Sequence, residues 1–265
     1  MSSPPSPPPP GPLAGLLVAD FSRVLAGPYC TMLLADLGAE VIKVEGPGGD
    51  DTRQWQPPVT ADGVSTYYLA INRNKRSVAL DLRRDTDRAA AAELARRADI
   101  LVENFKPGGL AKFGLDYASV SAVNPAIIYA SITGFGAGQG AALPGYDLIV
   151  QAMSGLMSLT GAADGPPYRA GVAVFDVMAG LHTAIAILAA LRHRDETGEG
   201  QLVESSLLAS AMSGLVNQAS AVAAGGVVPL RMGNAHPSLF PYEPLPTADG
   251  EIGRASCRER VLRLV

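Results

Sequence analysis

Residues 16–45 read LLVADFSRVLAGPYCTMLLADLGAEVIKVE, and this stretch decides the fold. It opens with an apolar run at 16–21 and closes with residues 40–45, in which Val41, Ile42 and Val44 are apolar; both runs are typical of strands. Residues 27–38 between them carry apolar side chains at helical spacing. A strand, a helix and a second strand in this order favour parallel strands, because the crossover helix returns the chain to the same edge of the sheet.

The alternation of strands and helices continues beyond this unit. Its pattern predicts strands at 77–82, 100–104 and 127–131, and helices at 85–97 and near 117–123. We therefore expect the α/β fold class, with a doubly wound, Rossmann-like parallel sheet. From residue 146 the pattern becomes mainly helical, at about 146–159, 176–194 and 205–223.

The two ends of the chain differ from the rest. Residues 1–12 hold seven of the 21 prolines and are expected to be disordered. Residues 251–261 read EIGRASCRERV, which resembles a translated sequencing adaptor, so 253–265 are interpreted as a non-native tail on a C-terminally truncated chain. The domains expected in between are a Rossmann-like large domain at 13–195, a helical linker at 196–225 and the start of a small domain at 226–252.

Composition excludes several classes of protein. Two cysteines cannot form a disulfide framework, and no apolar run in the sequence approaches the ~18 residues of a membrane span. A net charge of −4 gives no general reason to bind nucleic acid. No cluster has the spacing of a metal site, so no metal is predicted. We expect a cytoplasmic protein that contacts neither membranes nor nucleic acid.

A ligand in such a sheet lies beyond the carboxyl ends of the strands. Residues 102–105 and 132–135 end two predicted strands there. The glycine loop 134–140 does not match the G-x-G-x-x-G dinucleotide fingerprint. A basic group around Lys75 and Arg76 is interpreted as a solvated face or as a site for a phosphorylated ligand.

Asp176 has two compatible interpretations. It lies between the apolar, strand-like run 169–175 and the next helix, where an aspartate commonly caps the helix N-terminus. A carboxylate at that place, ionised by the helix dipole, is also suited to act as a nucleophile. The spacing alone leaves both open.

A set of motifs in order resembles the class III coenzyme A transferases. The resemblance covers about residues 13–250 and rests on AGP at 26–28, VIKVE at 41–45, NKRS at 74–77, VENFKPG at 102–108, GYD at 145–147, GPP at 165–167, the Asp176 segment and RMGN at 231–234. It implies an enzyme that moves coenzyme A from an acyl-CoA donor to a small carboxylic acid. In that reaction Asp176 would form first a mixed anhydride and then an aspartyl-CoA thioester.

The resemblance also implies where coenzyme A binds, as a substrate and not as a permanently bound cofactor. Matching motifs place nine residues along it: Leu25, Ala26, Leu80, Arg83, Asn104, Phe105, Lys112, Tyr146 and Asp147. Leu25 stands where formyl-CoA transferase has a glutamine, which favours a succinate-like dicarboxylate or a carnitine-like acid over oxalate. An interlocked homodimer is expected for the full-length protein.

Two alternatives remain. Racemases of the same fold use a histidine in a Gly-His-Asp triplet as the base, whereas this chain has Tyr146, whose ordinary pKa of about 10 makes it a poor base at neutral pH. The chain is alternatively a non-catalytic fragment that binds coenzyme A.

Overall fold

The computed structural model describes residues 11–254 and 262–264. The remaining residues of the expected disordered N-terminus (1–12) and of the expected tail (253–265) lie outside this range. The described chain forms two compact units. Unit 1 comprises residues up to Asp147 and 174–211, and unit 2 comprises 148–173 and the residues from Met212 onward.

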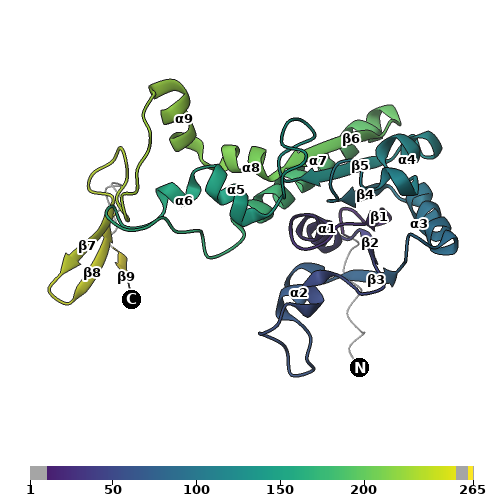
Figure 1. The fold of residues 1–265 in the computed structure, drawn as a ribbon, viewed down its shortest axis with the longest axis horizontal. Helices are drawn as coiled ribbons and strands as arrows, with labels where there is room; N and C mark the ends of the chain where they lie inside the picture. Colours follow the sequence, from purple (N-terminus) through teal and green to yellow (C-terminus); the bar gives the residue numbers. More distant parts are fainter. Residues whose placement is uncertain (1–10, 255–261, 265) are drawn as a thin grey trace, which may run out of the picture. The chain divides into compact units, whose positions relative to one another are not determined.

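Unit 1 is built on a six-stranded sheet in the order β3-β2-β1-β4-β5-β6 (Figure 1). Every neighbouring pair in this sheet is parallel. Its strands are β1 (Leu17–Asp20), β2 (Glu40–Glu45), β3 (Lys75–Ala79), β4 (Ile100–Glu103), β5 (Ile128–Thr133) and β6 (Gln201–Ser206). The predicted doubly wound α/β fold is confirmed.

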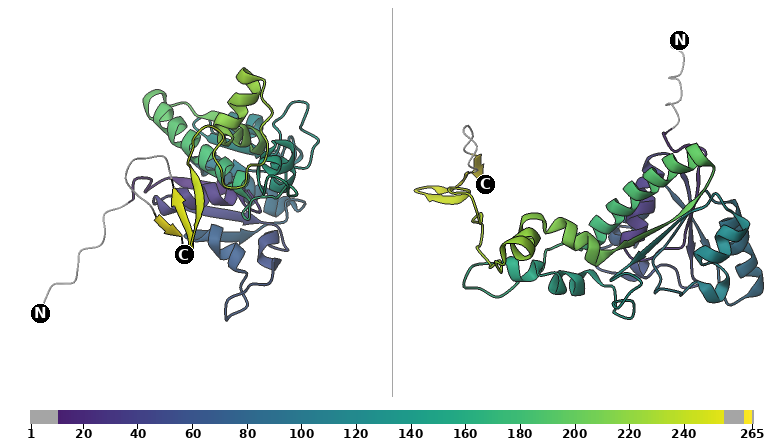
Figure 2. Two further views of the ribbon diagram at one scale, coloured as in Figure 1. Left: turned by 90° about the vertical axis from the view of Figure 1, so that its left-hand side faces the viewer. Right: turned by 90° about the horizontal axis from the view of Figure 1, so that it is seen from above.

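Helices cover both faces of the sheet (Figure 2). On one face α1 (Ala26–Asp36) packs against α7 (Val174–Thr197), and α7 also contacts β5 and β6. The two helices approach closely, since a Cβ added at Gly180 would lie 2.7 Å from the carbonyl oxygen of Ala26. The opposite face carries α3 (Asp85–Arg97) and α4 (Tyr117–Val123).

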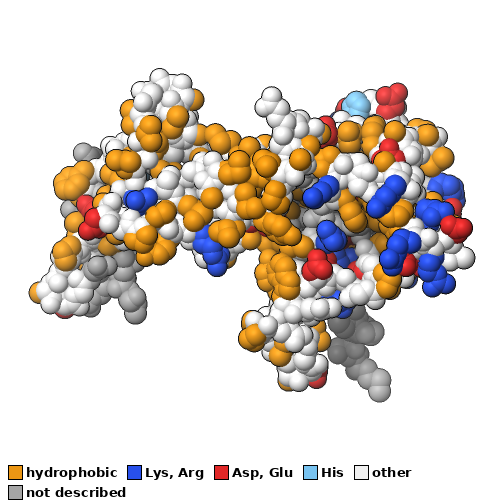
Figure 3. Space-filling model, viewed as in Figure 1, with side chains coloured by type: hydrophobic (Ala, Val, Ile, Leu, Met, Phe, Trp, Pro, Cys, Tyr) orange, Lys and Arg blue, Asp and Glu red, His pale blue; other side chains and the backbone are white. Residues whose placement is uncertain are grey.

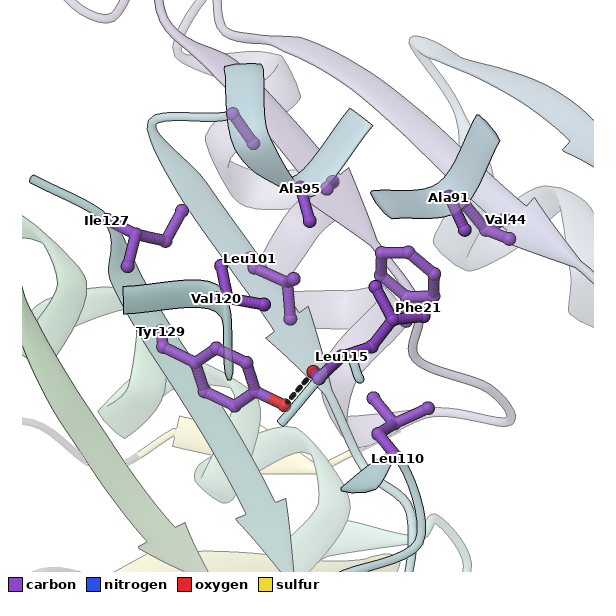
Figure 4. Close-up of a cluster of buried hydrophobic side chains, with 12 residues drawn as sticks. Phe21, Val44, Ala91, Ala95, Leu101, Leu110, Leu115, Val120, Ile127 and Tyr129 are labelled. Atoms are coloured by element: carbon purple, nitrogen blue, oxygen red, sulfur yellow. Dashed lines mark hydrogen bonds between the residues drawn. The ribbon is translucent and has the colours of Figure 1, made fainter. Parts of the chain in front are cut away.

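The core under α3 and α4 shows why these residues select this fold (Figure 4). Ala91 and Ala95 of α3 leave room for the strand side chains Leu101 and Tyr129 to pack beneath the helix. The Tyr129 hydroxyl donates to the backbone oxygen of Leu115 at 2.9 Å, so this buried polar group is satisfied. Residues that alternate along each strand supply the two faces of the sheet.

Helix α7 is long and apolar enough to cross a membrane by length and composition, with a mean hydropathy of 1.9. The expectation that no such run exists is therefore wrong for this helix. Its side chains Phe175, Ala179, Thr183 and Ile187 recur at helical spacing and are buried in unit 1. This is the packing of a core helix that covers a sheet.

Several elements differ from the sequence prediction. The predicted helix at 146–159 is divided into α5 (Asp147–Met153) and α6 (Leu156–Leu159), and the one at 205–223 into α8 (Leu207–Gly214) and α9 (Val216–Gly225). The run 169–175 is not a strand, and its last two residues already belong to α7. Strand β3 begins at Lys75, two residues before the predicted start, and ends at Ala79. Strand β6 lies within 196–225, for which only helices were predicted, because just Leu202 and Val203 interrupt its polar sequence. Helix α2 (Thr66–Asn72) follows the Pro-rich segment 46–58 and was not predicted.

Unit 2 contains short helices and a separate sheet. The helices are α5 (Asp147–Met153), whose first residue belongs to unit 1, α6 (Leu156–Leu159), the end of α8 (Leu207–Gly214) and α9 (Val216–Gly225). Its antiparallel sheet comprises β7 (Glu243–Thr247), β8 (Gly250–Arg254) and β9 (Leu262–Leu264). Gln151 of α5 accepts a hydrogen bond from the Ala170 amide at 2.8 Å, which ties the 160–173 loop to that helix.

Candidate active site

The order in which the chain adds strands to the parallel sheet reverses between β1 and β4. From β1 the chain proceeds to β2 and β3 on one side, and from β4 to β5 and β6 on the other. The loops that leave such a pair of strands diverge and open a crevice at their carboxyl ends. Here Asn104, after β4, joins the two loops: its side chain accepts from the Arg23 amide at 2.9 Å and donates to the Arg23 carbonyl at 2.7 Å.

A cleft of about 780 Å³ opens at this point, and we call it the Asp176 cleft. Loops after β1, β4 and β5 form its walls, including Gly134, Phe135, Gly136 and Gly140 of the glycine loop. Its other lining residues include Arg23, Val24, Ala26, Asp51, Trp55, Asn104, Phe105, Lys106, Tyr146, Asp176 and Leu207. The carboxylate of the predicted nucleophile thus lies in a cleft at the switch point of the sheet.

A second cavity of about 330 Å³, the apolar pocket, adjoins this cleft. The two share Arg23, Asp51 and Phe105. Apolar side chains line much of the pocket, namely Phe21, Val44, Leu80, Leu82, Phe105 and Phe113. The shared residues make the cleft and the pocket neighbouring parts of one groove.

Asp176 lies in the first turn of α7, and it is not the helix cap. Instead Asp147 Oδ1 accepts hydrogen bonds from the amides of Phe175 at 2.8 Å and Asp176 at 3.2 Å. Burial first, and then the nearby Asp147 carboxylate, raise the pKa of Asp176 to about 7. Burial and the like charge of Asp147 thus oppose the ionisation that the helix dipole favours, and the role of Asp176 as a nucleophile stays a prediction.

The predicted coenzyme A residues occupy several places. Ala26, Asn104, Phe105 and Tyr146 line the Asp176 cleft, while Leu80, Arg83 and again Phe105 line the apolar pocket. Leu25 is buried with 7% of its surface exposed and lines neither cavity, and neither do Lys112 and Asp147. The ammonium of Lys112 lies 4.9 Å from the ring centroid of Phe113, which lines the apolar pocket. The role of all nine residues in binding coenzyme A stays a prediction.

Part of the cleft wall comes from the segment 54–67, which no sequence pattern had singled out and whose lining residues are Gln54 and Trp55. Trp55 lines the Asp176 cleft, and the Tyr67 ring packs against it edge to face with centroids 4.9 Å apart. Burial, and then the carboxylates of Asp176 and Asp147, raise the pKa of Tyr67 to about 12. No periodic pattern marks this segment, so only the folded chain brings it to Asp176.

A buried ionic network lies under the loop that follows β1. The Lys75 ammonium donates to Asp20 Oδ2 at 3.1 Å, to the Pro28 carbonyl at 2.8 Å and to Asn72 Oδ1 at 3.0 Å. Burial alone would raise the pKa of Asp20, but Lys75, Lys43 and two hydroxyl donors hold it at about 2. The interpretation of Lys75 as part of a solvated or ligand-binding face is wrong, because its side chain is 2% exposed and fully paired.

Within residues 11–254 and 262–264, no group of three or more His, Cys, Asp or Glu side chains is arranged to hold a metal ion.

Comparison with known proteins gives consistent matches. The family model described as CoA-transferase family III matches residues 13–262. The chain is 52% identical over 246 residues to succinate–glutarate CoA-transferase of Agrobacterium fabrum, covering 90% of this chain and 62% of that protein. It is 46% identical over 255 residues to succinyl-CoA:mesaconate CoA-transferase of Haloarcula hispanica, covering 91% and 63%.

A solved structure shows the same similarity. The crystal structure of a CAIB/BAIF family protein from Brucella suis superposes with a TM-score of 0.87 at 47% identity, covering 92% of this chain and 66% of that one. The chain thus spans slightly less than two thirds of the length of each of these three proteins.

Proposed function

We propose that this protein, which belongs to CoA-transferase family III, moves coenzyme A from an acyl-CoA donor to a free carboxylic acid. One observation carries the proposal: the Asp176 carboxyl lies at the carboxyl-end crevice of the sheet, with a pKa of about 7. A carboxyl group with that pKa is substantially ionised near neutral pH, and its burial leaves it less stabilised by water than an exposed carboxylate.

The proposed reaction proceeds in two steps on Asp176. An Asp176 oxygen attacks the thioester carbonyl of the donor and the carbon–sulfur bond breaks. Coenzyme A departs as the thiolate, and a mixed anhydride of Asp176 and the donor acid is formed. The thiolate then attacks the aspartyl carbonyl, which releases the donor acid as a carboxylate and leaves an aspartyl-CoA thioester. The acceptor carboxylate reverses the two steps, so no net proton or electron is needed.

Water would hydrolyse both intermediates, so the cleft has to exclude it. Phe135, Leu143 and Trp55 place apolar surface around the Asp176 cleft. The Asp147 carboxylate satisfies the first amides of α7, which holds the backbone of Asp176 in place while its side chain exchanges partners.

We assign the acids to the dicarboxylate class. The supporting observations are the printed names of the two relatives above, which act on succinate, glutarate and mesaconate.

The complete enzyme is proposed to be a cytoplasmic homodimer. Large apolar side chains on the outer face of α7, Leu181, Ile185 and Leu188, are exposed in the single chain. Unit 2 exposes others, including Val228, Leu230 and Phe240. Apolar surface of this extent is typical of a face that another chain covers.

Transfer is tested by incubating the protein with succinyl-CoA and either glutarate or mesaconate, and following the new thioester. Asp176→Asn is expected to lower the rate by at least roughly a thousandfold while coenzyme A still binds. The matched control is Asp195→Asn, an exposed aspartate on the same helix. Hydroxylamine added during turnover should modify Asp176.

Three results would contradict the proposal. Turnover retained by Asp176→Asn removes that residue from the nucleophile role. Deuterium incorporation at the α carbon of a 2-methylacyl-CoA, without transfer, supports the racemase alternative. Binding of coenzyme A with neither reaction supports a non-catalytic fragment.

A further inference from the structure

Arg23 stands at the junction of the apolar pocket and the Asp176 cleft and lines both. We propose that its guanidinium binds the pyrophosphate of coenzyme A, and that the neighbouring Asp51 weakens this contact. The inference rests on the proposed function, because it assumes that coenzyme A occupies the groove.

The chemical order of coenzyme A matches the order of the groove. The thioester has to reach Asp176 in the cleft, and the flat adenine base suits the apolar pocket with its Phe105, Phe113 and Leu80 walls. The pyrophosphate joins the nucleoside to the pantetheine arm. It therefore falls at the junction, where Arg23 is the cation that lines both cavities.

The backbone of Arg23 is held on both sides. Asn104 binds its amide and its carbonyl, and the next residue, Val24, adopts a left-handed φ of 66°. That conformation is uncommon for a β-branched residue and persists only where surrounding contacts impose it. The loop thus presents Arg23 in a defined direction before any ligand binds.

The guanidinium itself is only weakly engaged. It lies 5.4 Å from the Phe105 ring centroid and 3.9 Å from Asp51, in an ion pair whose two side chains are 55% and 61% exposed. Such an exposed, long pair contributes little. The planar fork of Arg23 remains available for a bidentate contact with phosphate oxygens.

The other cations of the apolar pocket are already paired. Arg83 binds Asp81 through two of its nitrogens, at 2.8 and 2.9 Å. Lys43 is buried and binds Asp50 and the Ser22 carbonyl, at 2.8 and 2.9 Å. Figure 3 shows basic and acidic side chains interspersed over α3 and β3, where pairs such as Arg96–Glu93 lie on the surface. Lys106 lines the Asp176 cleft but not the apolar pocket.

The test measures the affinity for coenzyme A and for dephospho-coenzyme A, which keeps the pyrophosphate but lacks the 3′-phosphate. Arg23→Met is expected to raise the Kd for both by the same factor, roughly 10- to 100-fold. Arg23→Lys keeps the charge but loses the fork, so its Kd should lie between those of the wild type and Arg23→Met. Arg96→Met, which removes an exposed, paired arginine on α3, serves as the matched control.

Asp51→Asn is expected to change the Kd in the opposite direction to Arg23→Met. Removing a negative charge beside the phosphate should lower the Kd for both ligands by roughly two- to fivefold at low salt, and less at high salt. A lower Kd in Asp51→Asn cannot come from general damage to the fold, because such damage would only weaken binding.

The other possible results each contradict one part of the proposal. An unchanged Kd in Arg23→Met overturns the inference while the proposed function stands. A loss confined to coenzyme A assigns Arg23 to the 3′-phosphate instead. Unchanged or weaker binding in Asp51→Asn overturns the role of Asp51. If the wild-type protein binds neither ligand, the proposed function itself fails.

Discussion

Asp147 Oδ1 lies 3.2 Å from the backbone nitrogen of Asp176 and accepts its hydrogen bond. Two carboxylates therefore share one helix N-terminus, and only Asp147 is shown taking up its amides. Burial and the negative charge of Asp147 raise the pKa of Asp176 to about 7, so that its carboxyl titrates near neutral pH.

Asp147→Asn is expected to lower the pKa of Asp176. The asparagine oxygen can still accept from the α7 amides, but the like charge is gone. Burial, the larger cause, remains, so the ionisation limb of the pH–rate profile for transfer should move down by roughly half a unit to one unit from about 7. Transfer rates from pH 5 to 9 measure this shift.

Asp164→Asn, at an exposed aspartate of unit 2, is the control for that profile. A profile of Asp147→Asn that coincides with the wild-type curve would show that Asp147 does not set the pKa of Asp176. A shift toward higher pH would contradict the sign of the argument.

Asp176→Asn should stabilise the protein in a pH-dependent way. The pKa of this carboxyl is raised in the folded state, so the folded chain binds more protons than the unfolded chain between about pH 4 and 7. The protonated Asp176 side chain therefore lowers the stability of the wild type least below about pH 4, the pKa it has in the unfolded chain. As the pH rises from about 4 to 7, the free energy of unfolding of the wild type falls. The asparagine variant does not titrate and avoids this loss.

The expected difference is small at pH 4 and reaches roughly 2 to 4 kcal/mol in unfolding free energy at pH 8. Urea denaturation at several pH values measures it, with the exposed Asp195→Asn as the matched control. A stabilisation that is the same at pH 4 and pH 8 would show that desolvation of the Asp176 charge is not its cause.

Lys75→Met is expected to destabilise unit 1 by about 3 to 5 kcal/mol, because it leaves the Asp20 carboxylate buried beside fewer donors. The neighbouring Arg76→Met removes an exposed arginine paired with Glu40 and should change stability by about 1 kcal/mol or less. Urea midpoints for the two variants give the comparison. Equal midpoints would mean that the buried pair contributes no more than the surface pair.

Part of the site was predictable from local sequence. Asp176 follows an apolar run near the start of a long helix, whereas Tyr146 and Asp147 were singled out by the resemblance to a known family. Strand ends at Glu103 and Thr133 lie where the apolar runs stop, which placed Asn104 and the glycine loop at the carboxyl edge of the sheet.

The remaining parts of the site depend on contacts between distant residues. Trp55 and Tyr67 come from a segment without periodicity, and Arg23 is oriented by Asn104, which lies 81 positions away. Lys75 belongs to a run of basic residues in the sequence, yet the fold buries it against Asp20. The local sequence does not indicate which of several neighbouring basic side chains becomes buried in the fold.

The parallel, doubly wound sheet follows from the amino-acid sequence, because alternating apolar strands and helices leave few other ways to bury both faces. The sequence also indicated that Asp176 lies at the beginning of a helix, which the structure places in the first turn of α7. The raised pKa of that carboxyl depends on the folded chain, since burial and the Asp147 charge act on it only when residues 28 and 29 positions apart meet at one helix end.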